Sequence, residues 1–219
     1  MSTCRFDTCF FEQYAQISLS VLLGGEFDAL ENRDRPDLQS ADGRSIGIEV
    51  TRAMEESRHA EEALLKDVAG ITPGIGEADV ERIRESGYAF GLRGDKVIGA
   101  KELSYWSMAL PLRRILESKV AKVGNGFYGR FDHMGLYVFS RENLDLPQAV
   151  MAMNYTLSLQ KYQDVRYNRL YLADVDDLFV CNLDDGLRTS SRLLRYPITQ
   201  SQRKEFYTEA VQRLTHVPS

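Results

Sequence analysis

Hydrophobic positions along the chain change between helical and strand-like spacing, which predicts a protein of mixed helices and strands. Over residues 8–23 apolar side chains recur every three to four positions and two glycines follow, so we expect a helix there. Residues 45–51 form a nearly continuous apolar run with β-branched members, as in a buried strand. A turn signal at Ala41-Asp42-Gly43 precedes it. Further helices are expected at 54–69, 77–86, 105–123, 147–163 and 200–214, and further strands at 26–32, 34–38, 134–140 and 170–183.

These elements together favour a single α+β domain with one central sheet. The chain has 219 residues, which is enough for one sizeable core and cramped for two full domains. We therefore expect one domain over residues 1–219. The sequence contains 43% hydrophobic and 27% charged residues, a balance typical of globular proteins rather than disordered ones.

The composition also bears on the compartment. No apolar run approaches the roughly 18 to 20 residues of a membrane helix, and no secretory signal is visible at the start. The cysteines Cys4, Cys9 and Cys181 make an odd count without metal-ligand spacing. We expect a cytoplasmic protein with reduced thiols and no membrane association.

The net charge of −5, from 27 Lys and Arg against 32 Asp and Glu, excludes a uniformly basic protein that coats nucleic acid. Two stretches are nevertheless basic: residues 110–130 carry five basic side chains and one acidic one, and residues 187–204 carry five basic and no acidic ones. Tyr128, Tyr196 and Tyr207 offer aromatic rings on which bases could stack. The alternative, an ordinary solvated surface, stays open.

Two carboxylates, Asp37 and Glu49, lie on neighbouring strands of the expected antiparallel meander. Turn geometry brings such positions close together, and the two charges repel unless a cation lies between them. Hard oxygen ligands of this kind suit Mg²⁺ or Mn²⁺, which polarises a phosphoryl oxygen and lowers the pKa of bound water. Two simpler interpretations remain: Asp37 caps the turn, and Glu49 pairs with an arginine across the sheet.

A Pro-Asp pair ending at Asp37 and, after eleven intervening residues, a Glu-Val-Thr triplet beginning at Glu49 resemble the PD-(D/E)xK phosphodiesterase superfamily. The order of the surrounding elements is similar over residues 8–140, with 141–219 as additional helices and strands. The resemblance implies a restriction-endonuclease-like fold, a central mixed sheet flanked by helices. It also implies Mg²⁺-dependent hydrolysis of nucleic-acid phosphodiester bonds, and a homodimer as in many such nucleases.

The sequence departs from this motif at Thr51, where the family has a lysine that positions the attacking water. Thr51 donates a hydrogen bond but carries no positive charge. We expect a lysine from elsewhere, Lys119 or Lys122 with Lys66 as a third choice, to approach the scissile phosphate. Arg52 is unsuited because strand alternation directs it to the opposite face of the sheet.

Glu12 on the first helix is the candidate third metal ligand, against the alternative of a partly exposed helix charge. The leading hypothesis is thus a metal-dependent nuclease in which Asp37 and Glu49 hold the cation. The alternative is a nuclease-like fold without activity, which binds nucleic acid or another protein through its surface.

Overall fold

The computed structural model describes residues 8–53, 92–93, 96–97, 100–140, 143–184 and 192–215. The helices expected at 54–69 and 77–86 lie outside the described residues. The chain forms two compact units, one of residues 1–53 with 115–219 and one of residues 54–114. In the second unit, β4 (Leu92–Arg93) and β5 (Lys96–Val97) form an antiparallel pair.

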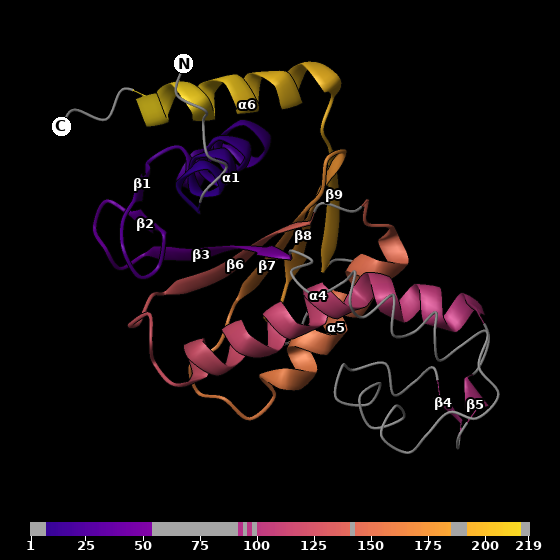
Figure 1. Ribbon diagram of the computed structural model, residues 1–219. Coiled ribbons are helices and arrows are strands. Elements are labelled where there is room, and N and C mark those ends of the chain that lie inside the picture. Colours follow the sequence, from indigo (N-terminus) through magenta and orange to yellow (C-terminus); the bar gives the residue numbers. More distant parts are fainter. Residues whose placement is uncertain are drawn as a thin grey trace. The chain divides into compact units, whose positions relative to one another are not determined.

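The larger unit contains a seven-stranded mixed sheet, in the order β1-β2-β3-β6-β7-β8-β9 (Figure 1). β3 pairs in parallel with β6, and β6 in parallel with β7, while the other neighbours are antiparallel. The mixed α+β class expected from the sequence is confirmed. The strands are β1 (Leu30–Asn32), β2 (Leu38–Ser40), β3 (Ile46–Ala53), β6 (His133–Ser140), β7 (Arg169–Ala173), β8 (Asp177–Asn182) and β9 (Leu193–Pro197).

The described helices lie close to their expected positions. They are α1 (Thr8–Leu23), α4 (Ala100–Gly124), α5 (Leu146–Leu159) and α6 (Gln200–Thr215), with a 3-10 turn η1 (Gly25–Phe27) after α1. α4 begins five residues before the expected start at 105. Among these described helices, none has the length and apolar content needed to cross a membrane.

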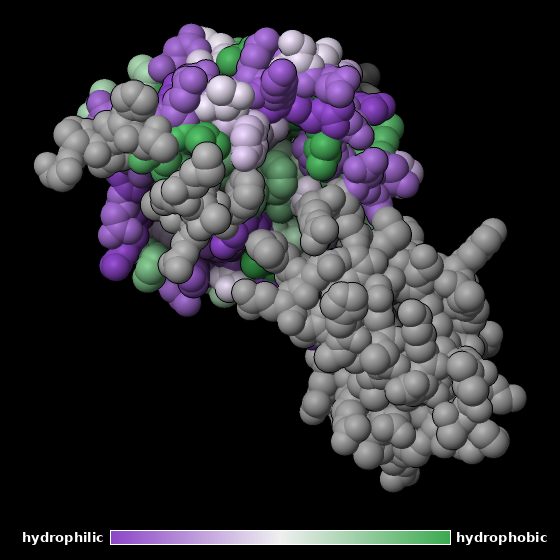
Figure 2. All heavy atoms as spheres, turned by 45° about the horizontal axis from the view of Figure 1, so that its top comes forward, coloured by the Kyte–Doolittle hydropathy of each residue, from purple (hydrophilic) through white to green (hydrophobic). Residues whose placement is uncertain are grey.

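Within the larger unit, helices cover both faces of the sheet. Figure 1 shows α1 and α6 on one side of the sheet, and α5 with the last turns of α4 on the other. On the α1 side, Ile48 and Val50 of β3 belong to a buried cluster with Leu19 of α1. Side chains alternate along a strand, so the neighbouring position, Glu49, faces the α4 side. Seen with the α6 side forward, the described surface is mostly hydrophilic, with hydrophobic residues in small groups (Figure 2).

Arg52 confirms this alternation. Its guanidinium carbon lies 4.8 Å from the ring centroid of Phe11 on α1, so it points away from the face that carries Glu49. The prediction that Arg52 cannot replace the missing motif lysine therefore agrees with the structure.

β9 is a strand that the hydrophobic pattern did not predict. It pairs with β8 at the sheet edge, with Leu194 opposite Val180, yet its side chains are half-buried or exposed throughout. An edge strand held by backbone hydrogen bonds needs no alternating apolar face, and its Pro197 is tolerated at an edge. The stretch was therefore interpreted only as part of a basic run.

Candidate functional site

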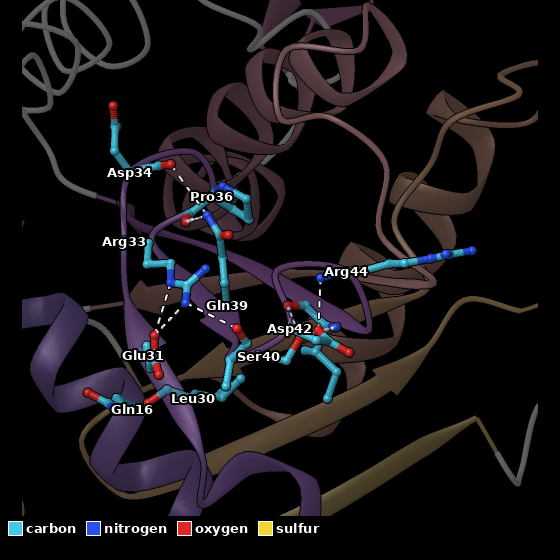
Figure 3. Close-up of polar contacts among 12 residues, drawn as sticks. Gln16, Leu30, Glu31, Arg33, Asp34, Pro36, Gln39, Ser40, Asp42 and Arg44 are labelled. Atoms are coloured by element: carbon cyan, nitrogen blue, oxygen red, sulfur yellow. Dashed lines mark hydrogen bonds and ion pairs between the residues drawn. The ribbon is translucent and has the colours of Figure 1, made fainter.

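The loop between β1 and β2, which carries Asp34 and Pro36 (Figure 3), leads to Asp37 at the start of β2. The Arg33 guanidinium donates to the Glu31 carboxylate at 2.6 Å, and the Arg33 amide donates to the Asp37 carbonyl at 2.8 Å. The buried Gln39 amide group donates to the Pro36 carbonyl at 3.0 Å. These bonds tie the loop to β2, so Asp37 enters the strand in a defined position.

Asp42 holds the turn between β2 and β3. Its carboxylate accepts hydrogen bonds from the Ser40 hydroxyl at 2.6 Å and from the amides of Arg44 and Ser45, both at 2.9 Å (Figure 3). These donors lower the pKa of Asp42 well below its ordinary value. The turn predicted at this point is confirmed, and it sets the register of the two strands.

That register brings the two predicted carboxylates together. Leu38 pairs with Ile48, so Asp37 and Glu49 lie one step further along the same ladder. The Asp37 Oδ2 atom accepts the amide of Val50 at 2.7 Å. Burial, and then the negative charge of Glu49, raise the pKa of Asp37 to about 7, against the lowering effect of the Val50 amide. A proton or a cation is therefore favoured between them.

Glu12 of α1 approaches this pair but is engaged elsewhere. Its side chain is buried, which contradicts the alternative of a partly exposed helix charge. Its Oε2 atom accepts the Asn32 side-chain amide at 2.9 Å. Its charge contributes to the raised pKa of Asp37, so the two carboxyl groups are close enough to interact electrostatically. Within the described part of the chain, no three Asp, Glu, His or Cys side chains are arranged to hold a metal ion.

Among the described residues, Lys119 of α4 is the cation that contacts Glu49, and the candidate Lys66 lies outside them. The Lys119 Nζ atom lies 2.5 Å from Glu49 Oε1, and the two side chains are only 14% and 10% exposed. The partner of Glu49 is thus a lysine from a distant helix rather than the arginine considered as an alternative. An ammonium group now stands beside the carboxylates despite the threonine at the motif position.

The other two predicted site residues lie differently. Thr51 follows Glu49 by two positions on β3, on the same face of the strand, and is half-buried. Lys122 is exposed, and its Nζ atom lies 5.4 Å from the ring centroid of Phe127. Of the two candidate lysines on α4, it is Lys119 that contacts Glu49.

Two tyrosines that the sequence analysis did not assign to the site also line it. Tyr128 is 4% exposed, and among the described residues no group meets its hydroxyl with the distance and angle of a normal hydrogen bond, although Glu49 and Tyr167 lie near enough to influence its pKa. Burial and the charge of Glu49 raise its pKa, so it stays a protonated donor. The Tyr167 hydroxyl, also buried, donates to the Lys119 carbonyl at 3.3 Å. Because Tyr128 is buried, it offers no exposed face for a base, contrary to its predicted stacking role.

The second basic stretch is partly neutralised. Arg195 donates to both carboxylate oxygens of Asp177 at 2.7 Å, and Arg203 lies 2.8 Å from Asp176. These two arginines hold the β7–β8 turn, β9 and the start of α6 together. They contribute less to a phosphate-binding surface than the sequence count suggests.

No protein family, no curated protein and no solved structure matches this chain. The chemistry of the site therefore has to be argued from its own geometry.

Proposed function

We propose that this protein is a metal-dependent phosphodiesterase acting on nucleic acid, with a restriction-endonuclease-like arrangement of its core. The contact between Lys119 and Glu49, beside Asp37, carries the proposal. Two carboxylates and one ammonium group lie on the same face of the sheet, an arrangement that suits phosphodiester hydrolysis with Mg²⁺ or Mn²⁺.

The order of elements supports this arrangement. Helix α1 and the antiparallel strands β1 to β3 come first, and helix α4 and the parallel strand β6 come after an intervening segment that contains β4 and β5. This is the order that the resemblance to the PD-(D/E)xK superfamily implies.

In this proposal Asp37 and Glu49 hold the cation, and the nearby Glu12 of α1 adds negative charge to the site. The raised pKa of Asp37 supports the fit, because it marks a place where negative charge is uncompensated and a cation is favoured. The bound metal would polarise the phosphoryl oxygen and supply a more acidic water. Lys119 neutralises charge that develops on the phosphate, and Thr51 provides a hydrogen-bond donor at the motif position.

The test uses the full chain with labelled single- and double-stranded DNA and RNA, with Mg²⁺, Mn²⁺ or a chelator. We expect cleavage only with metal. Asp37→Asn and Lys119→Met should each reduce the rate by 100-fold or more, roughly the contribution of one positioned catalytic group. Asp34→Asn is the matched control, since Asp34 belongs to the same loop and its side chain is 85% exposed. Metal-independent cleavage, or equal rates for Asp37→Asn and Asp34→Asn, would overturn the proposal.

One observation favours the second candidate, a nucleic-acid-binding or protein-binding module without activity. The ion pair with Lys119 already compensates Glu49 without any metal. If neither Mg²⁺ nor Mn²⁺ raises the melting temperature and no substrate is cleaved, this function is the better supported one.

A further inference from the structure

An exposed aromatic ring, Phe127, has two cations near it, one of them in the loop that leads to Asp37. Phe127, in the turn after α4, is 49% exposed. The Arg35 guanidinium carbon lies 5.3 Å from its ring centroid, and the Lys122 Nζ atom lies 5.4 Å from it. We call these three residues the aromatic rim. Such distances are those of cation–π contacts.

Each member of the rim is close in the sequence to a residue of the site. Arg35 stands two positions before Asp37, in the loop that delivers that carboxylate. Lys122 follows Lys119 by three positions on α4, and residues so spaced share one face of a helix. Phe127 directly precedes Tyr128, and the two rings meet edge to face with centroids 5.1 Å apart. The rim is therefore built on the same three segments as the site.

The charges of the rim are available to a ligand. The Arg35 side chain is 63% exposed, and its contact with Asp34 is long, 3.5 Å, between two exposed groups. Exposed pairs of this kind contribute little and exchange readily for a stronger anion. Lys122 is exposed as well. An anion with two charged groups could draw Arg35 and Lys122 off the Phe127 ring and so leave a face of the ring to a planar group.

We propose that the aromatic rim binds single-stranded nucleic acid, with an unpaired base stacked on Phe127 and neighbouring phosphates held by Arg35 and Lys122. Cations alone would suit any polyanion, but an exposed ring among them suits a ligand that alternates charge with flat aromatic groups. In a duplex both faces of a base are covered by its neighbours, whereas an unpaired base is free to stack. The inference rests on the proposed function in taking nucleic acid as the ligand of this site.

The test measures binding of the full chain by fluorescence anisotropy, in chelator, so that no cleavage occurs. The probes are a labelled oligothymidylate, a backbone of the same length without bases, and a duplex of that length. Phe127→Leu keeps the apolar bulk but removes the aromatic face, and Phe127→Trp keeps the face. We expect Phe127→Leu to weaken oligothymidylate binding about 5- to 100-fold, the range of one lost stacking contact, and Phe127→Trp to retain it.

Several controls separate stacking from other effects. Phe127→Leu should leave binding of the base-free backbone unchanged, and the duplex should bind more weakly than the oligothymidylate. The double variant Arg35→Gln with Lys122→Gln should weaken both single-stranded probes and reduce their salt dependence. Tyr162→Leu is the matched control, because Tyr162 is 88% exposed and has the Lys161 Nζ atom 5.1 Å from its ring centroid. It should bind like the unaltered protein.

The inference is overturned if Phe127→Leu binds oligothymidylate as the unaltered protein does, if it loses the base-free backbone equally, or if Tyr162→Leu has the same effect. The outcome is separable from the proposed function. Loss of cleavage in Asp37→Asn with no binding change in Phe127→Leu refutes the rim and keeps the nuclease. Base-dependent binding through Phe127 without any metal-dependent cleavage keeps the rim and refutes the nuclease.

Discussion

Replacing Lys119 by Met removes the one cation seen to contact Glu49 among the described residues. The Met side chain preserves most of the lysine's length, so the change is mainly the loss of charge. Glu49 is 10% exposed and its partner 14% exposed, so water replaces little of the lost interaction. Two unit charges about 4 Å apart attract by roughly 4 kcal/mol at an effective dielectric constant of about 20. Stranding one member of a buried pair costs about 3–5 kcal/mol.

We therefore expect Lys119→Met to lower the free energy of unfolding by about 3–5 kcal/mol at pH 8, a large share of a typical domain's stability. The loss should shrink at pH 5, because Asp37, whose pKa is raised to about 7, is then protonated and no longer adds its negative charge beside the unpaired Glu49. The double variant Lys119→Met with Glu49→Leu should recover most of the stability, since it removes both charges.

Urea denaturation at the two pH values, arranged as a double-mutant cycle, measures these differences. Lys122→Met is the control, because Lys122 lies one helical turn away and is exposed; it should change the free energy of unfolding by less than about 0.5 kcal/mol. If Lys119→Met is as mild as Lys122→Met, or if the double variant is less stable than Lys119→Met, the pair is not the buried, coupled contact described above.

Two further predictions concern the neighbours of this pair. Because the pKa of Asp37 is raised to about 7 and a cation binds only its ionised form, Mg²⁺ affinity should weaken about tenfold from pH 8 to pH 6. Calorimetric titration at both values tests this, and an affinity independent of pH in this range would contradict it. Tyr128→Phe removes a buried hydroxyl that forms no hydrogen bond of normal geometry among the described residues, so it should keep or raise the melting temperature. A clear drop in thermal unfolding experiments would show that this hydroxyl is bound to something in the folded protein.

The elements that could be predicted are those in which the spacing of apolar residues along the chain reflects which side chains are buried. α1 runs over the expected residues because apolar side chains recur at helical spacing and most of the helix is buried, and β3 was evident because its apolar run is buried on both faces. β9 could not be predicted because an edge strand held by backbone hydrogen bonds needs no alternating apolar pattern in its sequence. α5 ends at Leu159, earlier than expected, because the buried Gln160 side chain bonds the backbone of Tyr167 and turns the chain back.

Only those features of the site that depend on residues close together in the sequence could be predicted. A turn of known length brings Asp37 beside Glu49, and that is a short-range property of the sequence. Lys119 and Lys122 lie one turn apart on α4, so the choice between them depends on which turn of the helix lies against Glu49, which is a long-range property. Tyr128 and Tyr167 line the site for the same reason. Spacing along the chain gave no sign that their hydroxyls would lie near Glu49.

The charge balance of the site links these observations to its chemistry. With Asp37 protonated, the group of Asp37, Glu49 and Lys119 is neutral, and the ion pair at 2.5 Å satisfies it without a ligand. Above pH about 7 Asp37 ionises, and the group carries one net negative charge in a partly buried place. A divalent cation beside both carboxylates would then compensate Glu49 in place of the lysine. Lys119 would then be free to leave Glu49 and pair with a bound phosphate. The ion pair with Glu49 is therefore compatible with a catalytic role for Lys119.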